Sequence, residues 1–555
     1  MSNWVKRGNA QTIAEVITRA AGVSEQELLN IELEDPRNID CLTSAADAFM
    51  DAVLAEQPIY IIGDYDSDGL NATAILSKLL SFMGSSFTDT VNATTIIPKR
   101  LSEGYGLSTE IIKRIPANSF VLTIDNGISA VDEVKTLKEK NCTVAILDHH
   151  LPGDVLPPAD FLADPHINPD NNGFAYYCGA GLGYQFARYL LEDDASPEAD
   201  HLRKEMAVHA AIATVTDMMP LLDANRVIVK DGLKIINEHR TELSGGLQAL
   251  LDTAATDIFN EDTFGFKLGP IINAPARLYN AGGTSVLKEL ICTDLPTAKG
   301  YADKMVAINE TRKSLVQEWT VYIMDQLEDA PIQCPLCVYI PGVPEGIIGI
   351  IAGKLSETYR MPAFMFSDSG EEGVLKGSGR SGGYMDLTPI LDAIRPLTVK
   401  CGGHSGAAGV SVTKDNFKKM ADAMRNRVGE SAEFSSDRPI EYDLELSQDI
   451  INKAYYEMNR FAPFGQGVQK PVFLIRNFRC VTRFGSHFRC MGPQKEHLKL
   501  NGTDCDAVGF GMAEQYLNMG SPAAVDILCT LAENRYNGKT SIQLSMIDFR
   551  PTQAN

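Results

Sequence analysis

The pattern of apolar and polar positions along the chain changes character at Pro58. Beyond that residue, short apolar runs alternate with stretches of helical periodicity; the runs are Ile59–Ile62, Phe120–Ile124 and Thr143–Leu147. Strand patterns that alternate with helix patterns are typical of an α/β domain with a parallel sheet. The pattern therefore predicts such a domain in this part of the chain.

Each of the three apolar runs ends in a turn that carries acidic side chains. The first run is followed by residues 63–69 (GDYDSDG), the second by 125–127 (DNG) and the third by 148–150 (DHH). In open α/β sheets, sites lie just beyond the carboxyl ends of the strands. We therefore expect the three turns to contribute to one shared site.

The flanking regions predict helices and a second α/β unit. Residues 1–50 are helical and acidic in pattern, and the periodicity of about 285–330, broken mainly at Pro296, predicts a helical connector. The pattern then predicts a strand at 337–340, a helix at 346–359 and a second strand at 363–366. Two glycine-rich loops at 376–381 and 402–409 and a charged helix at 414–427 follow.

From about residue 436 the pattern changes to short strands, as in a small β-barrel. The expected strands are 472–489, 497–500, 507–510, 524–531 and 541–549. The predicted fold class is therefore α/β, with two α/β lobes joined by a helical connector and followed by a β-barrel. The predicted segments are 1–50 (N-terminal helical segment), 51–240 (first lobe), 241–330 (connector), 331–432 (second lobe) and 433–555 (barrel).

Composition agrees with several domains and, taken alone, disfavours an anionic partner. The chain has 555 residues, of which 44% are hydrophobic and 22% charged, and this length exceeds what one core accommodates. Its formal net charge is -22, whereas phosphate binding depends on clustered Lys and Arg. An average of this kind can hide a local basic patch.

Such a patch lies in the predicted barrel. Residues 460–500 carry eight basic side chains against the single acid Glu496, which gives +7. Phenylalanines interleave with these cations, a mixture that lets a barrel bind single-stranded nucleic acid by phosphate contacts and base stacking. The equally weighted alternative is that the rings form the barrel core and the cations a solvated face. The side chains concerned are Arg476, Arg479, Arg483, Arg489 and Lys499, with Phe473, Phe478, Phe484 and Phe488.

The remaining composition predicts a soluble, cytoplasmic protein. The N-terminus lacks the apolar core of a signal peptide, and no apolar run approaches the roughly 18 residues needed to span a bilayer. The 11 cysteines are scattered. The close pair Cys334 and Cys337 has no second pair to complete a zinc site, so we expect structural thiols there.

The three carboxylates of the first turn point to a bound cation. Asp64, Asp66 and Asp68 lie within five residues, where mutual repulsion is costly unless a cation neutralises them. A solvated Asp-rich turn is the open alternative. A calcium loop would need a 12-residue pattern ending in Glu, and this does not follow Gly69.

Further candidate ligands come from the other turns and from an apolar segment. Asp148, His149 and His150 follow their own strand, so one imidazole can reach a metal and the other a phosphate oxygen. Asp217 is a charge inside the mostly apolar segment 213–220, which is expensive without a partner. A helix cap or a salt bridge would explain Asp217 equally well. Together with Asp125, these carboxylates and imidazoles favour Mn²⁺ or Mg²⁺ and suffice for two ions, an arrangement suited to in-line attack on phosphorus.

The second lobe offers groups suited to phosphate. Its two glycine-rich stretches contain Ser378 and Arg380 in the first and Gly403 and His404 in the second, so backbone that allows close approach lies beside polar side chains. Arg100 and Arg277 are further candidates for contacts with a nucleic-acid backbone. For either arginine taken singly, a surface salt bridge is the default interpretation.

Taken together, these motifs resemble the DHH/DHHA1 phosphoesterase superfamily and, within it, the RecJ family of single-stranded-DNA-specific exonucleases. The resemblance covers roughly residues 55–550, and its specificity comes from many blocks in one order. The blocks are 63–69, Arg100 with 103–106, 125–127, 148–150, 178–181, 214–221, 273–278, 346–352, 377–381 and 402–409.

The resemblance implies roles for individual residues. Asp66, Asp68, Asp125, His149 and Asp217 would bind two divalent ions, usually Mn²⁺, with Asp64 close by and Asp148 in support; His150 would face the scissile phosphate. Ser378, Arg380, Gly403 and His404 would grip the strand, and Arg100 and Arg277 would help to hold its 5′ end. The C-terminal unit would be an OB-fold that begins near residues 463–467.

Two stretches depart from the family pattern. Residues 343–346 read Val-Pro-Glu-Gly where the family often has Trp-His before the glycine, and Ala274-Pro275-Ala276 replaces a turn richer in glycine before Arg277. Because every inferred metal ligand is present, these departures bear on strand grip more than on chemistry.

The resulting expectation is a 5′ to 3′ exonuclease that degrades single-stranded DNA to 5′-mononucleotides in recombination and repair. The resemblance implies a single-stranded-DNA-binding protein and a helicase as partners, and a two-lobed cleft needs no second copy, so we expect a monomer. The alternatives are a nanoRNA or cyclic-dinucleotide phosphodiesterase, an inorganic pyrophosphatase, and a non-catalytic replication scaffold of the same fold. Chain length and the basic barrel favour a polymeric substrate over the first two.

Overall fold

The structure is a computed structural model that describes residues 3–86, 91–328, 330–429, 439–536 and 539–552. The chain divides into two compact units. The larger unit comprises residues 34–217 and 231–437, and the smaller one comprises 1–33, 218–230 and 438–555. The predicted N-terminal segment 1–50 thus contributes to both units, and the predicted boundary between residues 432 and 433 lies outside the described residues.

The first lobe of the larger unit contains the predicted parallel sheet. Its strands follow the order β3-β2-β4-β5-β6, and every pair in it is parallel. The bounds are β2 (Ile59–Ile62), β3 (Ala93–Ile96), β4 (Phe120–Ile124), β5 (Thr143–Leu147) and β6 (Phe161–Ala163). Because the central strands are covered on both faces, they are mostly apolar, with Thr123 and Thr143 as the exceptions in β4 and β5, rather than alternating.

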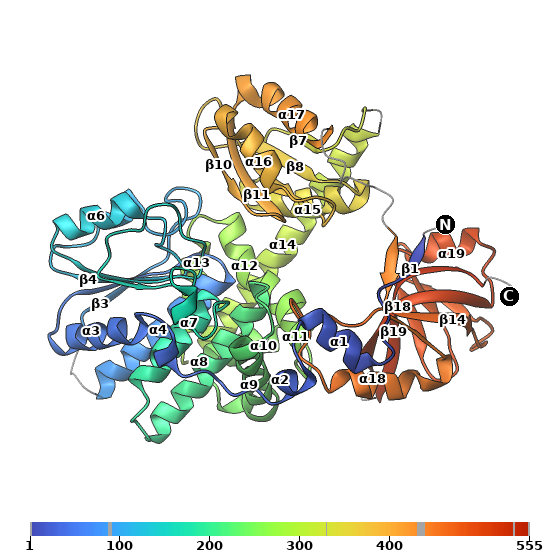
Figure 1. Ribbon diagram of the computed structural model, residues 1–555, viewed down its shortest axis with the longest axis horizontal. Coiled ribbons are helices and arrows are strands. Elements are labelled where there is room, and N and C mark those ends of the chain that lie inside the picture. Colours follow the sequence, from blue (N-terminus) through green and yellow to red (C-terminus); the bar gives the residue numbers. More distant parts are fainter. Residues whose placement is uncertain (1–2, 87–90, 329, 430–438, 537–538, 553–555) are drawn as a thin grey trace. The chain divides into compact units, whose positions relative to one another are not determined.

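Helices cover both faces of this sheet. Figure 1 shows α6 (Val131–Glu139) on one face and α3 (Leu42–Leu54) and α4 (Ser67–Ser86) on the other. A helical layer extends the α4 side through α7 (Gly179–Leu190) and α8 (Pro197–Thr216), which pack against α4 and each other. Next in the chain come α9 (Asp223–His239), α10 (Gly245–Asp252), α11 (Glu261–Thr263), α12 (Gly269–Leu278), α13 (Gly282–Leu290) and the connecting helix α14 (Leu295–Leu327).

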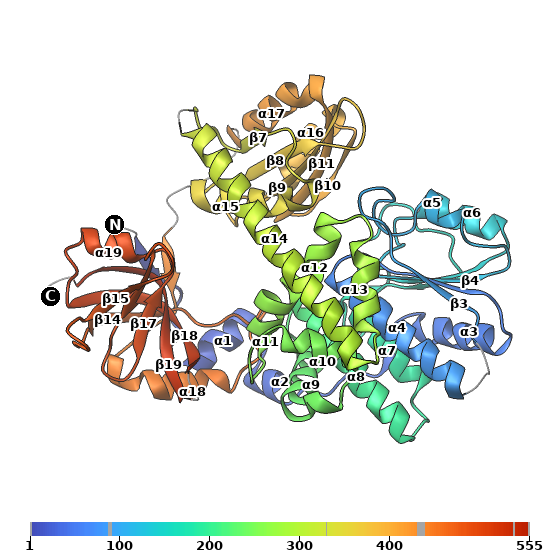
Figure 2. The same ribbon diagram turned by 180° about the vertical axis from the view of Figure 1, so that it is seen from behind.

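The second lobe is a mixed sheet with helices on both faces. Its order is β10-β11-β9-β8-β7, in which only β7 and β8 are parallel. Helix α15 (Ile348–Tyr359) packs on one face, and α16 (Thr388–Ile394) and α17 (Lys414–Gly429) cover the other (Figure 2). The strands are β7 (Leu336–Tyr339), β8 (Ala363–Asp368), β9 (Val374–Arg380), β10 (Lys400–Gly403) and β11 (Ala407–Thr413).

The expectation of two glycine-rich loops in this lobe was wrong, because both stretches lie mostly in strands. Gly377 and Gly379 pair with Phe366 and Phe364 of β8. A Cβ atom on Gly377 would lie 2.2 Å from the Phe366 ring, and one on Gly379 would lie 2.4 Å from the Phe364 ring. These glycines therefore make room for aromatic rings across the strand pair and do not mark a loop.

The smaller unit is built around a sheet of order β13-β14-β18-β19-β17-β16-β15. The predicted strand 472–489 was wrong in extent, since it divides into β14 and β15 around a tight turn with the bridge Arg483–Ser486. The strands are β13 (Leu444–Leu446), β14 (Phe473–Arg479), β15 (Phe488–Met491), β16 (His497–Leu500), β17 (Asp506–Gly509), β18 (Ala524–Tyr536) and β19 (Lys539–Pro551).

N-terminal elements complete this unit. The strand β1 (Trp4–Lys6) pairs with β12 (Ile440–Tyr442), and α1 (Ile13–Ala21) packs on α18 (Ile451–Asn459). The fully buried guanidinium of Arg226 donates hydrogen bonds to the carbonyl oxygens of Leu28, Phe461, Ala462 and Pro463. One side chain thus joins all three chain segments of the unit.

The phenylalanines of the basic stretch have different environments. Phe473 and Phe478 are buried in the core, and Phe488 is half-buried against Tyr516. Phe484, at the tip of the turn between β14 and β15, is fully exposed. Core packing therefore accounts for two of the four rings and not for Phe484. Among the described helices, none has the length and apolar character needed to span a bilayer.

Candidate active site

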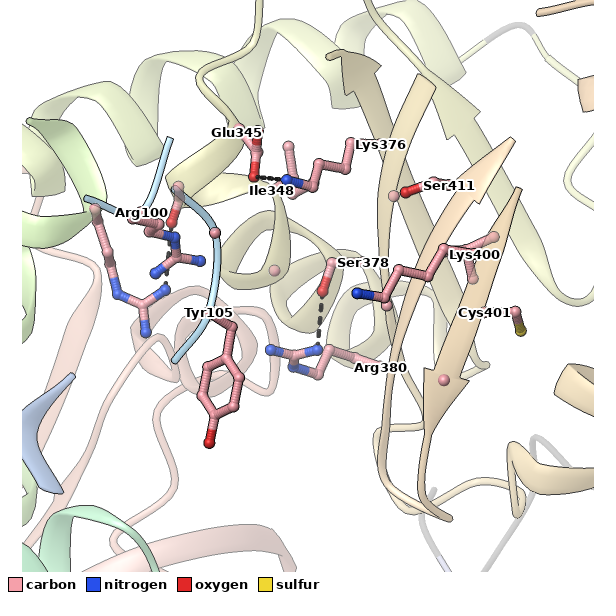
Figure 3. A pocket seen from close by; sticks show the side chains of 18 of the residues that line it. Arg100, Tyr105, Glu345, Ile348, Lys376, Ser378, Arg380, Lys400, Cys401 and Ser411 are labelled. Carbon is pink, nitrogen blue, oxygen red and sulfur yellow. Dashed lines mark hydrogen bonds and ion pairs between the residues drawn. The ribbon is translucent and has the colours of Figure 1, made fainter. Parts of the chain in front are cut away.

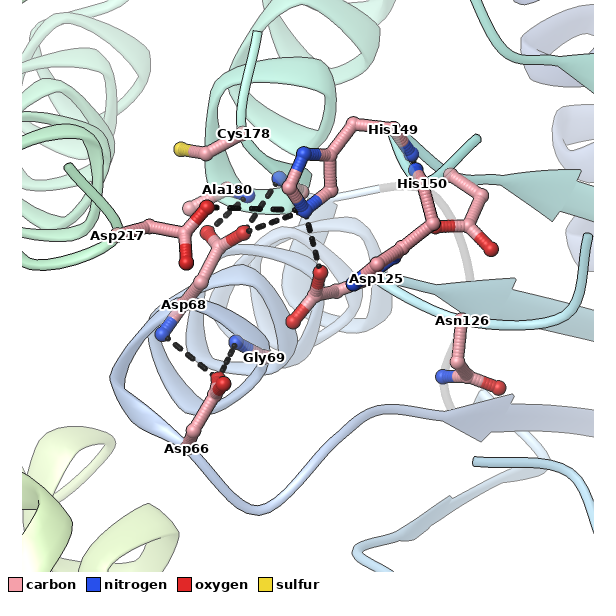
Figure 4. Close-up of polar contacts among 12 residues, drawn as sticks. Asp66, Asp68, Gly69, Asp125, Asn126, His149, His150, Cys178, Ala180 and Asp217 are labelled. Carbon is pink, nitrogen blue, oxygen red and sulfur yellow. Dashed lines mark hydrogen bonds and ion pairs between the residues drawn. The ribbon is translucent and has the colours of Figure 1, made fainter. Parts of the chain in front are cut away.

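The predicted acidic turns converge at the carboxyl edge of the parallel sheet. Asp64, Asp125 and Asp148 follow β2, β4 and β5, Asp68 lies in the first turn of α4, and Asp217 follows the last residue of α8. Figure 4 shows Asp68, Asp125 and Asp217 around the imidazole of His149, and Asp66 directed toward the backbone of Asp68 and Gly69. The strand ends and two helix ends thus supply one constellation.

Helix ends hold two of these carboxylates in place. Asp66 Oδ1 accepts hydrogen bonds from the backbone N–H groups of Asp68 and Gly69, both at 3.1 Å. Asp68 accepts from the N–H groups of Gly179 (2.6 Å) and Ala180 (2.8 Å) at the start of α7. Because free N–H groups at a helix start favour anions, both side chains are oriented before any ligand binds.

His149 faces three carboxylates at once. Its Nε2 atom lies 3.0 Å from Asp125 Oδ1, 3.5 Å from Asp68 Oδ2 and 3.8 Å from Asp217 Oδ2. Burial lowers the pKa of this imidazole. A neutral imidazole among carboxylates is the form that ligates a metal ion.

His150 points to a different set of partners. Its Nδ1 lies 2.8 Å from Asp148 Oδ1, and its ring lies 3.3 Å from the Tyr105 hydroxyl, which donates to the Asp125 carbonyl oxygen at 2.9 Å. Burial disfavours the charged form, but the hydrogen bond with Asp148 and the negative charges of Asp148, Asp217 and Asp68 together outweigh it and raise the pKa of His150 to about 9. The adjacent histidines therefore have different environments.

The carboxylates repel one another strongly without a cation. Burial, together with the neighbouring carboxylates, raises the pKa of Asp64, Asp66, Asp125 and Asp217 above the ordinary value of 3.8. Oδ1 of Asp64 is buried and has no hydrogen-bond partner among the described residues. A buried oxygen of this kind needs a ligand that the protein chain does not supply.

The geometry fits divalent ions. Three overlapping groups of ligand atoms each lie within 4.8 Å of one another: Asp64 with Asp66 and Asp125, Asp68 with His149 and Asp217, and Asp125 with His149 and His150. Oxygen and imidazole ligands without a thiolate match Mn²⁺ or Mg²⁺. The first two groups share no residue, which leaves room for two ions.

A basic cavity of about 450 Å³ lies in the same unit, between the first and second lobes. Arg100, Arg277, Ser378 and Arg380 all line it, together with Tyr105 of the acidic site. Figure 3 shows Ser378, Arg380 and Lys400 directed into the same space. Burial and the neighbouring Arg100 lower the pKa of Arg277, as expected where cations crowd together without an anion.

Not every predicted residue reaches this cavity. Gly403 and His404 lie at the turn between β10 and β11 and are not among its lining residues. The His404 N–H donates instead to the Ala407 carbonyl oxygen, at 2.9 Å. A role for these two residues in strand binding stays a prediction.

The basic stretch of the C-terminal sheet is partly neutralised. Arg476 pairs with Glu445 at 2.9 Å, and Asp506 lies 3.0 Å from Arg483 and 2.9 Å from Lys499. Arg479 and Arg489 are exposed and form no ion pair within the described part of the chain. These two cations remain available to a ligand.

Sequence reasoning missed some cavity residues, among them Lys376, Lys400 and Tyr105. Lys376 alternates along β9 with the predicted Ser378 and Arg380, so the three face the same side, a signal that the loop interpretation concealed. Lys376 pairs with Glu345 at 2.7 Å inside the cavity. Tyr105 lay in a motif already noted, but nothing in the sequence indicates its proximity to His150.

Comparisons with known proteins agree with this arrangement. Three family models match the chain: the DHH family, N-terminal domain over residues 58–214, the DHHA1 domain over 334–430 and the RecJ OB domain over 442–548. The chain is 30% identical to the single-stranded-DNA-specific exonuclease RecJ of Dickeya dadantii, over 94% of this chain and 93% of that protein. The chain belongs to the RecJ family.

Other RecJ proteins show the same relationship. The RecJ of Bacillus subtilis is also 30% identical, over 93% of this chain and 64% of that protein. A crystal structure of RecJ from Thermus thermophilus in complex with Mn²⁺ matches with a TM-score of 0.79 at 24% identity, covering 98% of this chain and 76% of that one. A crystal structure of exonuclease RecJ bound to manganese covers 71% of this chain and 96% of its own, with a TM-score of 0.59 at 27% identity. The predicted RecJ-like fold and family are confirmed.

Proposed function

We propose that this RecJ-family chain is an exonuclease that hydrolyses single-stranded DNA from its 5′ end with two divalent ions, Mn²⁺ in the first place. The observation that supports the proposal is a cluster of carboxylates and imidazoles that could hold metal ions, beside a basic cavity in one compact unit. The relatives named as single-stranded-DNA-specific exonucleases support the substrate class.

Asp64, Asp66, Asp68, Asp125, His149 and Asp217 would hold the ions. Ions bound there stabilise negative charge on a phosphoryl group and make water a better nucleophile at neutral pH. The chain's own contribution is to fix the ligands before substrate arrives, as the hydrogen bonds from the N-terminus of α7 to Asp68 do.

His150 would contact the scissile phosphate. Asp148 fixes one ring nitrogen at 2.8 Å, and Tyr105 lies on the side of the basic cavity. An imidazole held this way can donate a hydrogen bond to a phosphoryl oxygen, while Asp148 keeps the ring in orientation.

The basic cavity would bind the terminal phosphate and the first nucleotides. Arg100, Arg277 and Arg380 offer planar guanidinium donors, which suit phosphate, and the Ser378 hydroxyl lies 3.0 Å from Arg380. A strand end anchored in this cavity next to the ions implies stepwise release of 5′-mononucleotides.

The test is digestion of 5′-phosphorylated single-stranded DNA by the full chain with Mn²⁺. Strands labelled at either end report polarity, and we expect the 5′ label to appear first as a mononucleotide. Asp125→Ala and His149→Ala should each reduce the rate by a factor on the order of 10² or more. If either variant digests DNA at the wild-type rate, the site assignment is wrong.

A second arm compares long DNA, short RNA and pyrophosphate as substrates. Preference for a short substrate would replace the polymer assignment with a small-molecule phosphodiesterase. A wild-type chain that binds DNA without cutting it would indicate a scaffold. As partners in the cell, we propose a single-stranded-DNA-binding protein and a helicase, which would generate and present the single strand.

A further inference from the structure

Helices α4 and α8 meet along a line of buried and partly buried polar contacts that starts at the acidic site. The Thr216 hydroxyl donates to Ser67 Oγ at 2.8 Å, His209 Nδ1 lies 2.8 Å from Asn71 Oδ1, and Lys78 Nζ lies 2.8 Å from Glu205 Oε2. Residue numbers rise on α4 as they fall on α8, so the helices run antiparallel. We call these three contacts the polar seam.

The polar seam joins two helices whose ends carry metal-binding candidates. Ser67 lies between Asp66 and Asp68 at the start of α4, and Thr216 precedes Asp217 at the end of α8. Asp68 and Asp217 belong to one group of ligand atoms together with His149. Sliding of one helix past the other would therefore change the distance between these two carboxylates.

The middle contact has a defined direction. Asn71 Nδ2 donates to the Ser67 carbonyl oxygen at 2.7 Å, so Asn71 Oδ1 is the atom that faces the imidazole. A carbonyl oxygen only accepts, so His209 Nδ1 carries the proton. Burial, with a smaller contribution from Lys78, lowers the pKa of His209 to about 3, so the ring is neutral.

The contact between His209 and Asn71 contributes less to stability than an apolar pair at the same positions would. His209 and Asn71 are both fully buried, and His209 Nε2 has no partner among the described residues. An apolar pair would fill the same space without an unsatisfied nitrogen. A directional bond at this position instead fixes how the two helices register.

We propose that His209 is a positioning residue that, through Asn71, holds α4 and α8 in the register at which Asp68 and Asp217 bind the same divalent ion. The inference rests on the proposed metal-dependent function and deepens it. It assigns a role to a residue that touches neither the metal ligands nor the basic cavity.

The experiment measures Mn²⁺ binding to the full chain by isothermal titration calorimetry, independently of nuclease activity. His209→Leu removes the donor, whereas His209→Asn keeps an N–H close to the position of Nδ1. We expect His209→Leu to raise the Kd for Mn²⁺ about 10-fold, as for groups that orient metal ligands, and His209→Asn to stay within about 2-fold of wild type. Because the basic cavity is untouched, the KM for DNA should not change.

Two controls separate positioning from general destabilisation. Met206→Ala opens a cavity on the buried side of α8 without removing a seam contact, so it should lower Tm and leave the Kd for Mn²⁺ unchanged. In the double variant Asn71→Leu/His209→Leu, the Kd should be no higher than in the weaker-binding single variant, because both substitutions remove the same bond.

Three results would overturn the proposal: wild-type affinity in His209→Leu, an equal loss of affinity in Met206→Ala, or additive effects in the double variant. If His209→Leu binds Mn²⁺ normally while the wild type digests DNA, only the positioning role fails. If the wild-type chain binds no Mn²⁺, the proposed function fails, and the positioning role fails with it.

Discussion

At the scale of single residues, the carboxylates of the acidic site destabilise the metal-free fold but are suited to binding a cation. Asp64, Asp66, Asp125 and Asp217 are crowded in a buried setting where their pKa values rise, and one oxygen of Asp64 has no partner among the described residues. Arrangements of this kind persist in proteins where a ligand relieves them. Removing one of these charges should therefore raise the stability of the metal-free chain and lower the activity of the metal-bound chain.

Asp125→Asn tests this trade. We expect the free energy of unfolding of the chain in EDTA to rise, because burial and repulsion from Asp68, Asp66 and Asp64 disfavour a negative charge at this position. Exonuclease activity with Mn²⁺ should fall by a factor on the order of 10², because a ligand is lost. Thermal melting in EDTA and a DNA digestion assay measure the two effects, and an unchanged or lower Tm in EDTA would contradict the account.

The raised pKa values also set a pH dependence. A carboxyl group whose pKa is higher in the folded state than its ordinary 3.8 keeps its proton better when folded, so its contribution to stability is lost as pH rises above that value. Metal binding needs the deprotonated form and releases these protons. The increase in Tm caused by Mn²⁺ should therefore be larger at about pH 8 than at about pH 6, which differential scanning fluorimetry can measure. An increase that is equal at both pH values would contradict this linkage.

At the scale of elements, β9 shows how a strand brings cations to the basic cavity. Its outward positions carry Lys376, Ser378 and Arg380, while Gly377 and Gly379 leave room for Phe366 and Phe364. The close contact between each glycine and its ring holds β9 against β8. It thereby fixes the position of Lys376 and Arg380 relative to the basic cavity.

Gly377→Ala should disturb this fit. The added methyl would lie 2.2 Å from Phe366, and overpacking of this kind costs about 2 kcal/mol. We expect a lower Tm and a higher KM for DNA, with the Kd for Mn²⁺ unchanged because the acidic site lies in the first lobe. The matched variant Gly377→Ala/Phe366→Leu should recover most of the lost stability. If it does not, the ring contact is not the cause.

The elements also show what the sequence could and could not predict. The acidic strand ends were predictable because each apolar run is short, buried and followed within two residues by its carboxylate, as at Ile124 and Asp125. The strand β9 was not, because glycine paired with an aromatic ring resembles a loop until its neighbour is known. The contacts of Tyr105 with His150, and of Arg476 with Glu445, join residues far apart in the chain, and no local pattern encodes them.

At the scale of the whole molecule, the net charge of -22 confines nucleic-acid contact to local surfaces. The C-terminal sheet offers the exposed cations Arg479 and Arg489 and the fully exposed ring of Phe484, whose backbone φ of 53° is unusual for a bulky residue. Phe473 and Phe478 belong to the core, whereas the exposed ring of Phe484 does not.

Arg479→Ala/Arg489→Ala should weaken binding of long single strands and leave the hydrolysis of a dinucleotide unchanged. Because each phosphate contact releases counterions, the salt dependence of binding should become shallower, with a slope smaller by about 1.4 for two contacts on a single strand. Fluorescence anisotropy over a salt series measures the slope. Arg476→Ala is the matched control, since Arg476 is already paired with Glu445. An equal effect of this control would contradict the assignment.

The three-segment composition of the smaller unit has a consequence for inheritance. A gene break near codon 438 would separate the C-terminal sheet from Arg226. The carbonyl oxygens of Phe461 and Pro463 would then lose the guanidinium that donates hydrogen bonds to them. Joined to a protein without an equivalent arginine, this domain would have unfilled acceptors in its core. We expect the C-terminal sheet and the segment around Arg226 to have been inherited together, as parts of a single gene.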